Sequence, residues 1–75
     1  MLKLNQIDIN KKAQILNINL TENFKRRILD IGIIPGLYIY KIMESPFKKI
    51  SAYDINDTLI AIRDTEASNI EVKYV

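Results

Sequence analysis

The sequence has no cysteine, no histidine and no tryptophan, and it has only two glycines and two prolines. Without cysteine no disulfide can form, and without cysteine and histidine the usual ligand sets for zinc and for ferrous iron are missing. No apolar run reaches the roughly 18 residues of a membrane helix, and the first residues lack the apolar stretch of a signal peptide. We therefore expect a soluble, cytoplasmic protein that holds no cofactor and does not insert directly into a membrane.

The residues of a catalytic site are also missing. No histidine is available as a general base, and the serines and lysines show no spacing that would pair a nucleophile with a base. The pattern G-x-x-x-x-G-K-[S/T] is absent, so we expect no GTP binding through a P-loop. Asp54, Asp57 and Asp64 have the spacing of turns and a helix cap, which is a commoner role than a carboxylate metal site. The sequence predicts neither an enzyme nor a metal carrier.

Length and charge set the remaining limits. The chain has 75 residues, enough for one domain that spans residues 1–75, and its formal net charge is +2. Nucleic-acid-binding proteins usually have a dense basic stripe, whereas the only basic cluster here is Lys25, Arg26 and Arg27. A solvated helix face is the simpler interpretation of that cluster.

The first half of the chain predicts a strand, a helix and two consecutive turns. Residues 13–19 alternate as a short strand, and Thr21 is a suitable helix N-cap. The apolar residues of the helix recur at spacings of four and three and should form one stripe: Phe24, Ile28 and Ile31.

Three of the four glycines and prolines fall between residues 32 and 36. Gly32 stands where a helix ends in a left-handed residue, and Ile33 should then pack back on the helix. Residues 34–37 fit a type II turn, with proline second and glycine third. We expect Ile33 and Ile34 to be exposed or half-exposed between the two turns.

The second half predicts four more strands. Residues 37–45 are rich in strand-forming residues, but Lys41 falls on an apolar face, which indicates a bend or a bulge. After a loop at 46–49, residues 50–55 and 58–63 should pair as a hairpin around Asn56-Asp57. Asp64 would cap one helical turn, and a last strand begins at Ile70. The fold class is therefore mostly β with one helix, an SH3-like small β-barrel of about five short strands.

The chain resembles the FeoA family over roughly residues 2–74. The most specific part is Arg27-Ile28-Leu29-Asp30-Ile31-Gly32-Ile33-Ile34-Pro35-Gly36, which matches the helix end and the Leu-Gly-hydrophobic-x-Pro-Gly signature of that family. The strand from Ile39 and the loop at Pro46-Phe47 match as well. So do the pair Ile62-Arg63, the acidic helical turn after it and the final Ile70-Glu71-Val72. Isoleucine replaces the usual leucine at Ile31 and Ile62, and Lys11-Lys12 stand where the family often has glycine.

The resemblance implies a small cytoplasmic accessory protein of ferrous iron uptake. FeoA-like proteins are associated with the cytoplasmic side of FeoB, a membrane transporter with a GTP-binding domain. The resemblance thus implies that this chain binds a FeoB-like transporter and assists its assembly or regulation. Since the chain has no histidine and no cysteine, we do not expect it to carry the iron itself.

The predicted contact with the partner is an apolar patch flanked by two arginines. The patch would contain Ile33, Ile34, Tyr38 and Phe47, with Arg27 and Arg63 as polar anchors. Each of these residues also has a purely structural interpretation, as a core, surface or ion-pair residue. Two alternatives stay open, self-association through an exposed strand edge and a nucleic-acid-binding small β-barrel. The second would require a shared basic face, made of Lys11, Lys12, Lys25, Arg26, Lys48 and Lys49.

Overall fold

The structure, a computed structural model, describes the backbone of residues 1–75 and every side chain except that of Lys48. Its strands are β1 (Lys12–Ile18), β2 (Tyr38–Glu44), β3 (Ile50–Ile55), β4 (Thr58–Arg63) and β5 (Ile70–Tyr74). Its helices are α1 (Glu22–Asp30) and α2 (Asp64–Ala67), with 3-10 turns η1 (Leu4–Gln6) and η2 (Pro46–Lys48). The strands that the sequence predicts are all present, and the loop predicted at residues 46–49 contains η2.

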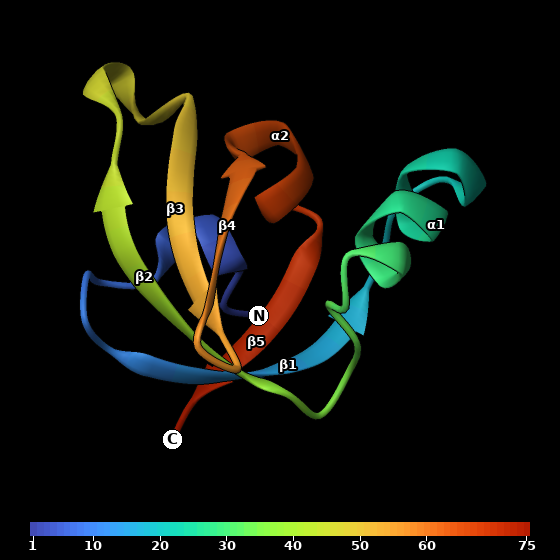
Figure 1. The fold of residues 1–75 in the computed structure, drawn as a ribbon, viewed down its shortest axis with the longest axis horizontal. Helices are drawn as coiled ribbons and strands as arrows, with labels where there is room; N and C mark the ends of the chain where they lie inside the picture. The colour runs from blue at the N-terminus through green and yellow to red at the C-terminus, as the bar shows by residue number, and fades with distance from the viewer.

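The five strands form one antiparallel sheet in the order β4-β3-β2-β1-β5. The sheet curls into a small barrel, with α1 standing at one side and α2 covering one end (Figure 1). The register of β2 against β3 shifts between Lys41 and Met43, which confirms the irregularity that the sequence predicts in this strand. Asn56 and Asp57 both have positive φ, 51° and 62°, as a two-residue hairpin of type I′ requires.

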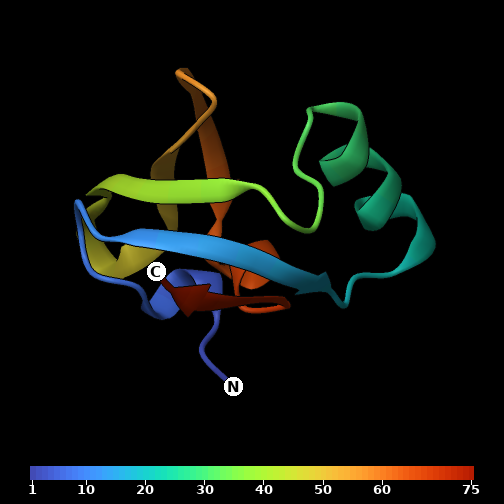
Figure 2. The same ribbon diagram turned by 90° about the horizontal axis from the view of Figure 1, so that it is seen from below.

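The N-terminal segment closes the base of the barrel, where β1, β2 and β5 run side by side above it (Figure 2). Leu4 and Ile7 are buried in the same core as the strand residues. The backbone of this segment is tied to β5, since the Val72 N–H donates to the Leu2 carbonyl at 2.9 Å. The N-terminal residues are therefore part of the barrel core, a role that the sequence pattern did not indicate.

Lys41 is buried inside the barrel, although it lies on the apolar face of β2. Its Nζ donates to the Asn5 carbonyl at 2.9 Å and pairs with the Glu44 carboxylate at 2.7 Å. These two contacts offset the cost of taking the ammonium group out of water. Lys41 thereby joins η1 to β2 from within.

A Schellman motif ends α1. Gly32 has a φ of +94°, its N–H donates to the Leu29 carbonyl at 3.0 Å, and the Ile33 N–H donates to the Ile28 carbonyl at 3.1 Å. Ile28 and Ile33 are both fully buried. The prediction that Ile33 returns to the helix at Ile28 is confirmed, but the expectation that it is exposed or half-exposed was wrong, because the residue after the glycine turns back into the core.

The type II turn at residues 34–37 is confirmed. The Leu37 N–H donates to the Ile34 carbonyl at 3.4 Å, and Gly36 has a φ of +97°. The Gly36 N–H also donates to the Ile15 carbonyl at 2.7 Å, which joins the turn to β1. Ile34 stays half-exposed, as the sequence predicts.

One predicted helix cap is only partly present, and the other prediction was wrong. Thr21 holds the N-cap position of α1, but its side chain makes no capping hydrogen bond. α2 has Arg63 at its N-cap, so Asp64 is the first residue of the helix and not its cap. The Asp64 carboxylate instead accepts from the Asn5 amide at 3.0 Å. A contact with η1 has replaced the local cap.

A candidate protein-interaction surface

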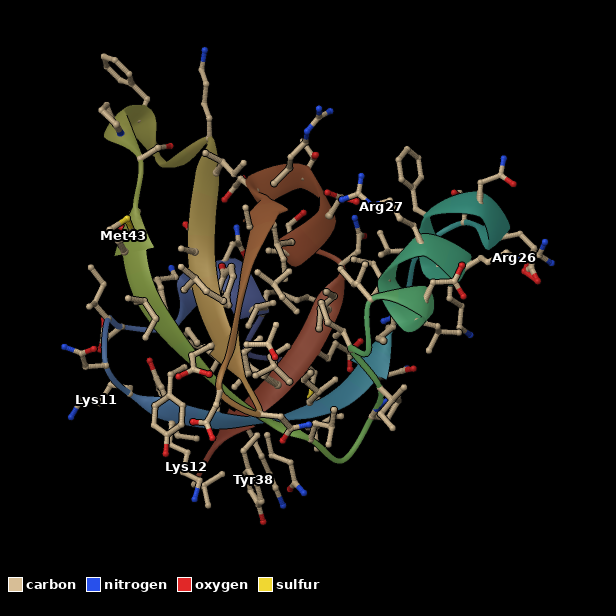
Figure 3. All side chains as sticks on the ribbon, viewed as in Figure 1. Lys11, Lys12, Arg26, Arg27, Tyr38 and Met43 are labelled. Carbon is tan, nitrogen blue, oxygen red and sulfur yellow. The ribbon has the colours of Figure 1, made fainter. Side chains whose placement is uncertain are left out.

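The residues of the predicted contact patch lie on different parts of the barrel. Tyr38 begins β2, whereas Phe47 lies in η2, beyond the other end of that strand. A seven-residue strand separates the two by about 20 Å. Figure 3 places Arg27 on a third side, between α1 and α2. Ile33 has no exposed surface and cannot touch a partner at all, so the single patch that the sequence predicts is wrong.

Tyr38 lies on the outer face of the sheet beside Lys12, where Figure 3 shows both side chains pointing away from the barrel. The Lys12 Nζ is 4.4 Å from the centroid of the Tyr38 ring, a cation–π contact. Lys11 is close by, but Arg26 projects from α1 on another side of the molecule (Figure 3). The basic residues of the nucleic-acid alternative thus do not gather on one face, and the Lys48 side chain lies outside the described part of the chain.

Phe47 and Arg63 lie near one end of the barrel. Arg63 is the last residue of β4 and is the register partner of Ile50, the first residue of β3. Phe47 is exposed in η2, immediately before β3. Both residues therefore lie toward the Glu44 end of β2, whereas Tyr38 lies at its other end.

The apolar stripe of α1 is buried only at its centre. Ile28 has no exposed surface, but Phe24 is 51% exposed and Ile31 is 41% exposed. A nine-residue helix that stands beside a barrel can press only one turn against it. The sequence correctly groups these three residues, but two of them remain available for contacts outside the chain.

A groove of about 360 Å³ lies between α1 and α2. We call it the α1–α2 groove, and it is lined by Asn19, Leu20, Thr21, Phe24, Thr65, Glu66 and Asn69. Leu20 and Phe24 form its apolar part, while hydroxyl and amide groups surround them. An apolar centre with a polar rim is the usual composition of a protein contact site.

An ion pair joins α1 to α2 beside this groove. The Arg27 Nη2 donates to Glu66 Oε1 at 2.8 Å. The Glu66 side chain is only 5% exposed, whereas Arg27 is 49% exposed. The second carboxylate oxygen, Oε2, is buried without a hydrogen-bond partner. Because a buried carboxylate without its cation is costly, Arg27 holds α1 at a fixed distance from α2.

The sequence reasoning did not assign Leu20, Phe24 or Glu66 to a contact site. A signal was present, because α1 and its C-cap residue Ile31 together contain four large apolar residues, more than one helical turn against a barrel can bury. No local sequence pattern predicts the ion pair of Arg27 with Glu66, because the two residues are 39 positions apart in the chain.

No other kind of site is visible in the described part of the chain. Its histidine, cysteine, aspartate and glutamate residues include no group of three or more that could hold a metal ion. None of its helices is long and apolar enough to cross a membrane.

The sequence and fold match known proteins across nearly the whole chain. Residues 2–74 match the FeoA domain family. A Campylobacter jejuni protein named provisionally as Fe(2+) transport protein A is 29% identical over 72 residues, which are 96% of this chain and 97% of that protein. The NMR structure of an FeoA-like protein from Clostridium acetobutylicum is 28% identical, with a TM-score of 0.86, and the match covers 100% of this chain and 91% of that one.

The barrel class is given by a further structure. FeoA of Stenotrophomonas maltophilia, solved with zinc and described as a prokaryotic SH3 domain protein, has a TM-score of 0.83 at 17% identity. The match covers 97% of this chain and 91% of that one. This likeness confirms the SH3-like small barrel that the sequence predicts.

Proposed function

Because this chain belongs to the FeoA family, we propose that it is an accessory protein of ferrous iron transport that binds a FeoB-like GTPase transporter. Its role is to assist the assembly or the regulation of that transporter from the cytoplasm. The family resemblance supports the choice of partner, and the exposed groove beside α1 supports a protein contact.

The α1–α2 groove is the contact that we assign to this function. Phe24 is the observation that carries the assignment, since half of its ring is exposed at the groove although it belongs to the apolar stripe of α1. A partner side chain that enters the groove would bury this ring, and buried aromatic rings dominate the binding energy of protein interfaces. Arg27, already held by Glu66, would keep its remaining N–H donors for a carboxylate of the partner.

The donor set of the chain supports contact rather than iron transfer. Ferrous sites in proteins favour imidazole and carboxylate, or thiolate, and the chain has neither histidine nor cysteine. Iron is therefore the cargo of the partner in this proposal.

The test is an NMR titration of isotope-labelled protein with the soluble GTP-binding domain of the FeoB-like transporter from the same organism. We expect chemical-shift changes at residues 20–31 and 64–69. The titration is carried out both with and without guanine nucleotide. The full-length transporter in nanodiscs is the second titrant, because the contact could include its membrane part. Absence of binding to both would overturn the proposed function. If binding changed only the chemical shifts of Tyr38 and its neighbours, the assignment of the contact to the α1–α2 groove would be wrong.

Two variants sharpen this test. Phe24→Ser removes the ring from the groove and should weaken binding about tenfold, the usual effect of losing a half-buried aromatic contact. Leu59→Ser is the matched control, because Leu59 is an exposed apolar residue of β4 near the β3–β4 hairpin. Its affinity should equal that of the unchanged protein. Equal affinities of all three proteins would contradict the assignment to the groove.

A further inference from the structure

One end of the barrel carries exposed apolar side chains that neither the core nor the α1–α2 groove uses. We call this end the β2–β3 tip, and it consists of Met43, Phe47, Lys49, Ile50 and Arg63. Figure 1 shows η2 here, at the upper left, away from the β3–β4 turn and from α1. Phe47 is 91% exposed, Met43 is 60% exposed and Ile50 is 40% exposed. Met43 and Ile50 line one shallow hollow, and Phe47 lies in the loop that joins their two strands.

Phe47 has a backbone conformation that disfavours its side chain. Its φ is +65°, in the left-handed region where glycine and asparagine are at ease and a bulky residue is strained. Packing of the side chain does not offset this strain, because the residue is almost wholly exposed and is not part of the core. Strained residues of this kind gather at functional sites. Neither local geometry nor packing accounts for a phenylalanine at this position.

The charge around the tip is positive. Residues 45–53 contain Lys48 and Lys49 and no acidic residue. Arg63 is beside them, since it pairs in register with Ile50 and the following Asp64 N–H donates to the Lys49 carbonyl at 2.9 Å.

Two acidic residues adjoin the tip in sequence, and both have partners within the chain. The Glu44 carboxylate is 2.7 Å from the Nζ of buried Lys41, and the Asp64 carboxylate accepts from Asn5 at 3.0 Å. Lys49 and Arg63 are exposed, whereas Glu44 and Asp64 are partly buried.

From these observations we propose that the β2–β3 tip docks on the surface of an anionic phospholipid membrane. A projecting aromatic ring with aliphatic neighbours can enter the headgroup region, and lysine and arginine beside it can contact lipid phosphates. An anionic bilayer complements both features at once. A protein partner would need a hollow for the ring and an acidic rim around it. With so few inserted side chains the docking is weak and reversible.

The test is co-sedimentation of the full chain with large unilamellar vesicles. One set contains phosphatidylcholine alone, and the other contains equal parts of phosphatidylcholine and phosphatidylglycerol. We expect binding to the anionic vesicles that falls at least about fivefold between low and high salt, because the contact is partly electrostatic. Equal binding to the two vesicle types, or no binding to either, would overturn the proposal.

Matched variants separate the ring from the charge. Phe47→Asn should lower the partition coefficient about tenfold by removing the inserted ring, while Leu59→Asn, exposed elsewhere on the barrel, should leave it unchanged. Lys49→Gln should lower it about fivefold, while Lys25→Gln on α1 should leave it unchanged. If each variant and its control lost the same fraction of the partition coefficient, the β2–β3 tip would have no role in membrane binding.

A melting experiment on Phe47→Asn tests whether this variant still folds. Phe47→Asn should melt no lower than the unchanged protein, because asparagine tolerates the positive φ and no buried contact is lost. If Phe47→Asn weakened binding to the transporter and not to vesicles, the tip would be a protein contact and the membrane proposal would fail. The vesicle result does not depend on the transporter, so it stands or fails separately from the proposed function.

Discussion

The buried side chain of Tyr53 makes the stability of this barrel depend on pH. Its ring lies in the core, and its hydroxyl is 3.5 Å from the Leu4 carbonyl. Burial away from water raises the pKa of Tyr53 from 10.0 to about 12, because the ionised phenolate is poorly solvated there. The nearby carboxylates of Asp64 and Glu44 act in the same direction, and the hydrogen bond with Ser51 opposes them.

A stability profile at alkaline pH checks this effect. Above pH 10 the unfolded chain loses the Tyr53 proton while the folded chain keeps it, so the free energy of unfolding falls as the pH rises from 10 to 12. Below pH 10 this group adds no pH dependence. Between pH 8 and pH 11 the unchanged protein should lose about 1.4 kcal/mol more than Tyr53→Phe, by urea denaturation. Tyr40→Phe on the outer face controls for loss of a hydroxyl group, and parallel profiles for all three proteins would contradict the prediction.

At the scale of the element, the two consecutive turns after α1 set the direction of the helix. Gly32 ends the helix and sends Ile33 into the core, and Gly36 then joins the chain to β1 through the Ile15 carbonyl. α1 is thus fastened at its C-terminal end by backbone contacts and to α2 by Arg27. Its N-terminal turn, which carries Phe24, is left beside the groove.

Gly32→Ala tests the first of these turns. No atom lies within 4 Å of a Cβ placed at Gly32, so the cost comes only from the positive φ of +94°. We expect the variant to lower the free energy of unfolding by about 1 kcal/mol, and Gly32→Asn to lower it less. Urea denaturation measures both values, and hydrogen exchange of the α1 amides should rise in parallel. An alanine variant as stable as the original would show that the motif is not what ends the helix.

At the scale of the whole molecule, the N-terminal segment is a wall of the barrel. Leu4 is fully buried, and Lys41, Asp64 and Tyr53 all reach this segment from other elements. A domain of 75 residues has a free energy of unfolding of only about 4 to 11 kcal/mol. The contacts of the N-terminal segment should therefore contribute a large share of that free energy.

Leu4→Ala measures that share. We expect a loss of about 3 kcal/mol, since the alanine leaves a cavity that a small core cannot refill. Leu59→Ala, at an exposed site on β4, should change stability by less than about 0.5 kcal/mol. Thermal and urea unfolding report both values. A loss at Leu4 no greater than that at Leu59 would mean that the N-terminal segment does not seal the core.

The sequence by itself determined the strands, the hairpin, the end of α1 and the type II turn. These features depend on residues within a few positions of each other, such as Gly32 with Ile28 or Asn56 with Asp57, so local preferences specify them. The sequence also carried the family signature around Arg27 and Gly36, and with it the class of barrel.

Only the tertiary structure decided which side chains are exposed and which are buried. Ile33 is buried because the Schellman motif faces the core, and Lys41 is buried because Asn5, 36 residues away, supplies a carbonyl. Tyr38 and Phe47, near in sequence, lie apart because the length of β2 separates them. Contacts between distant residues set each of these outcomes, and a periodic pattern along one element contains no information about them.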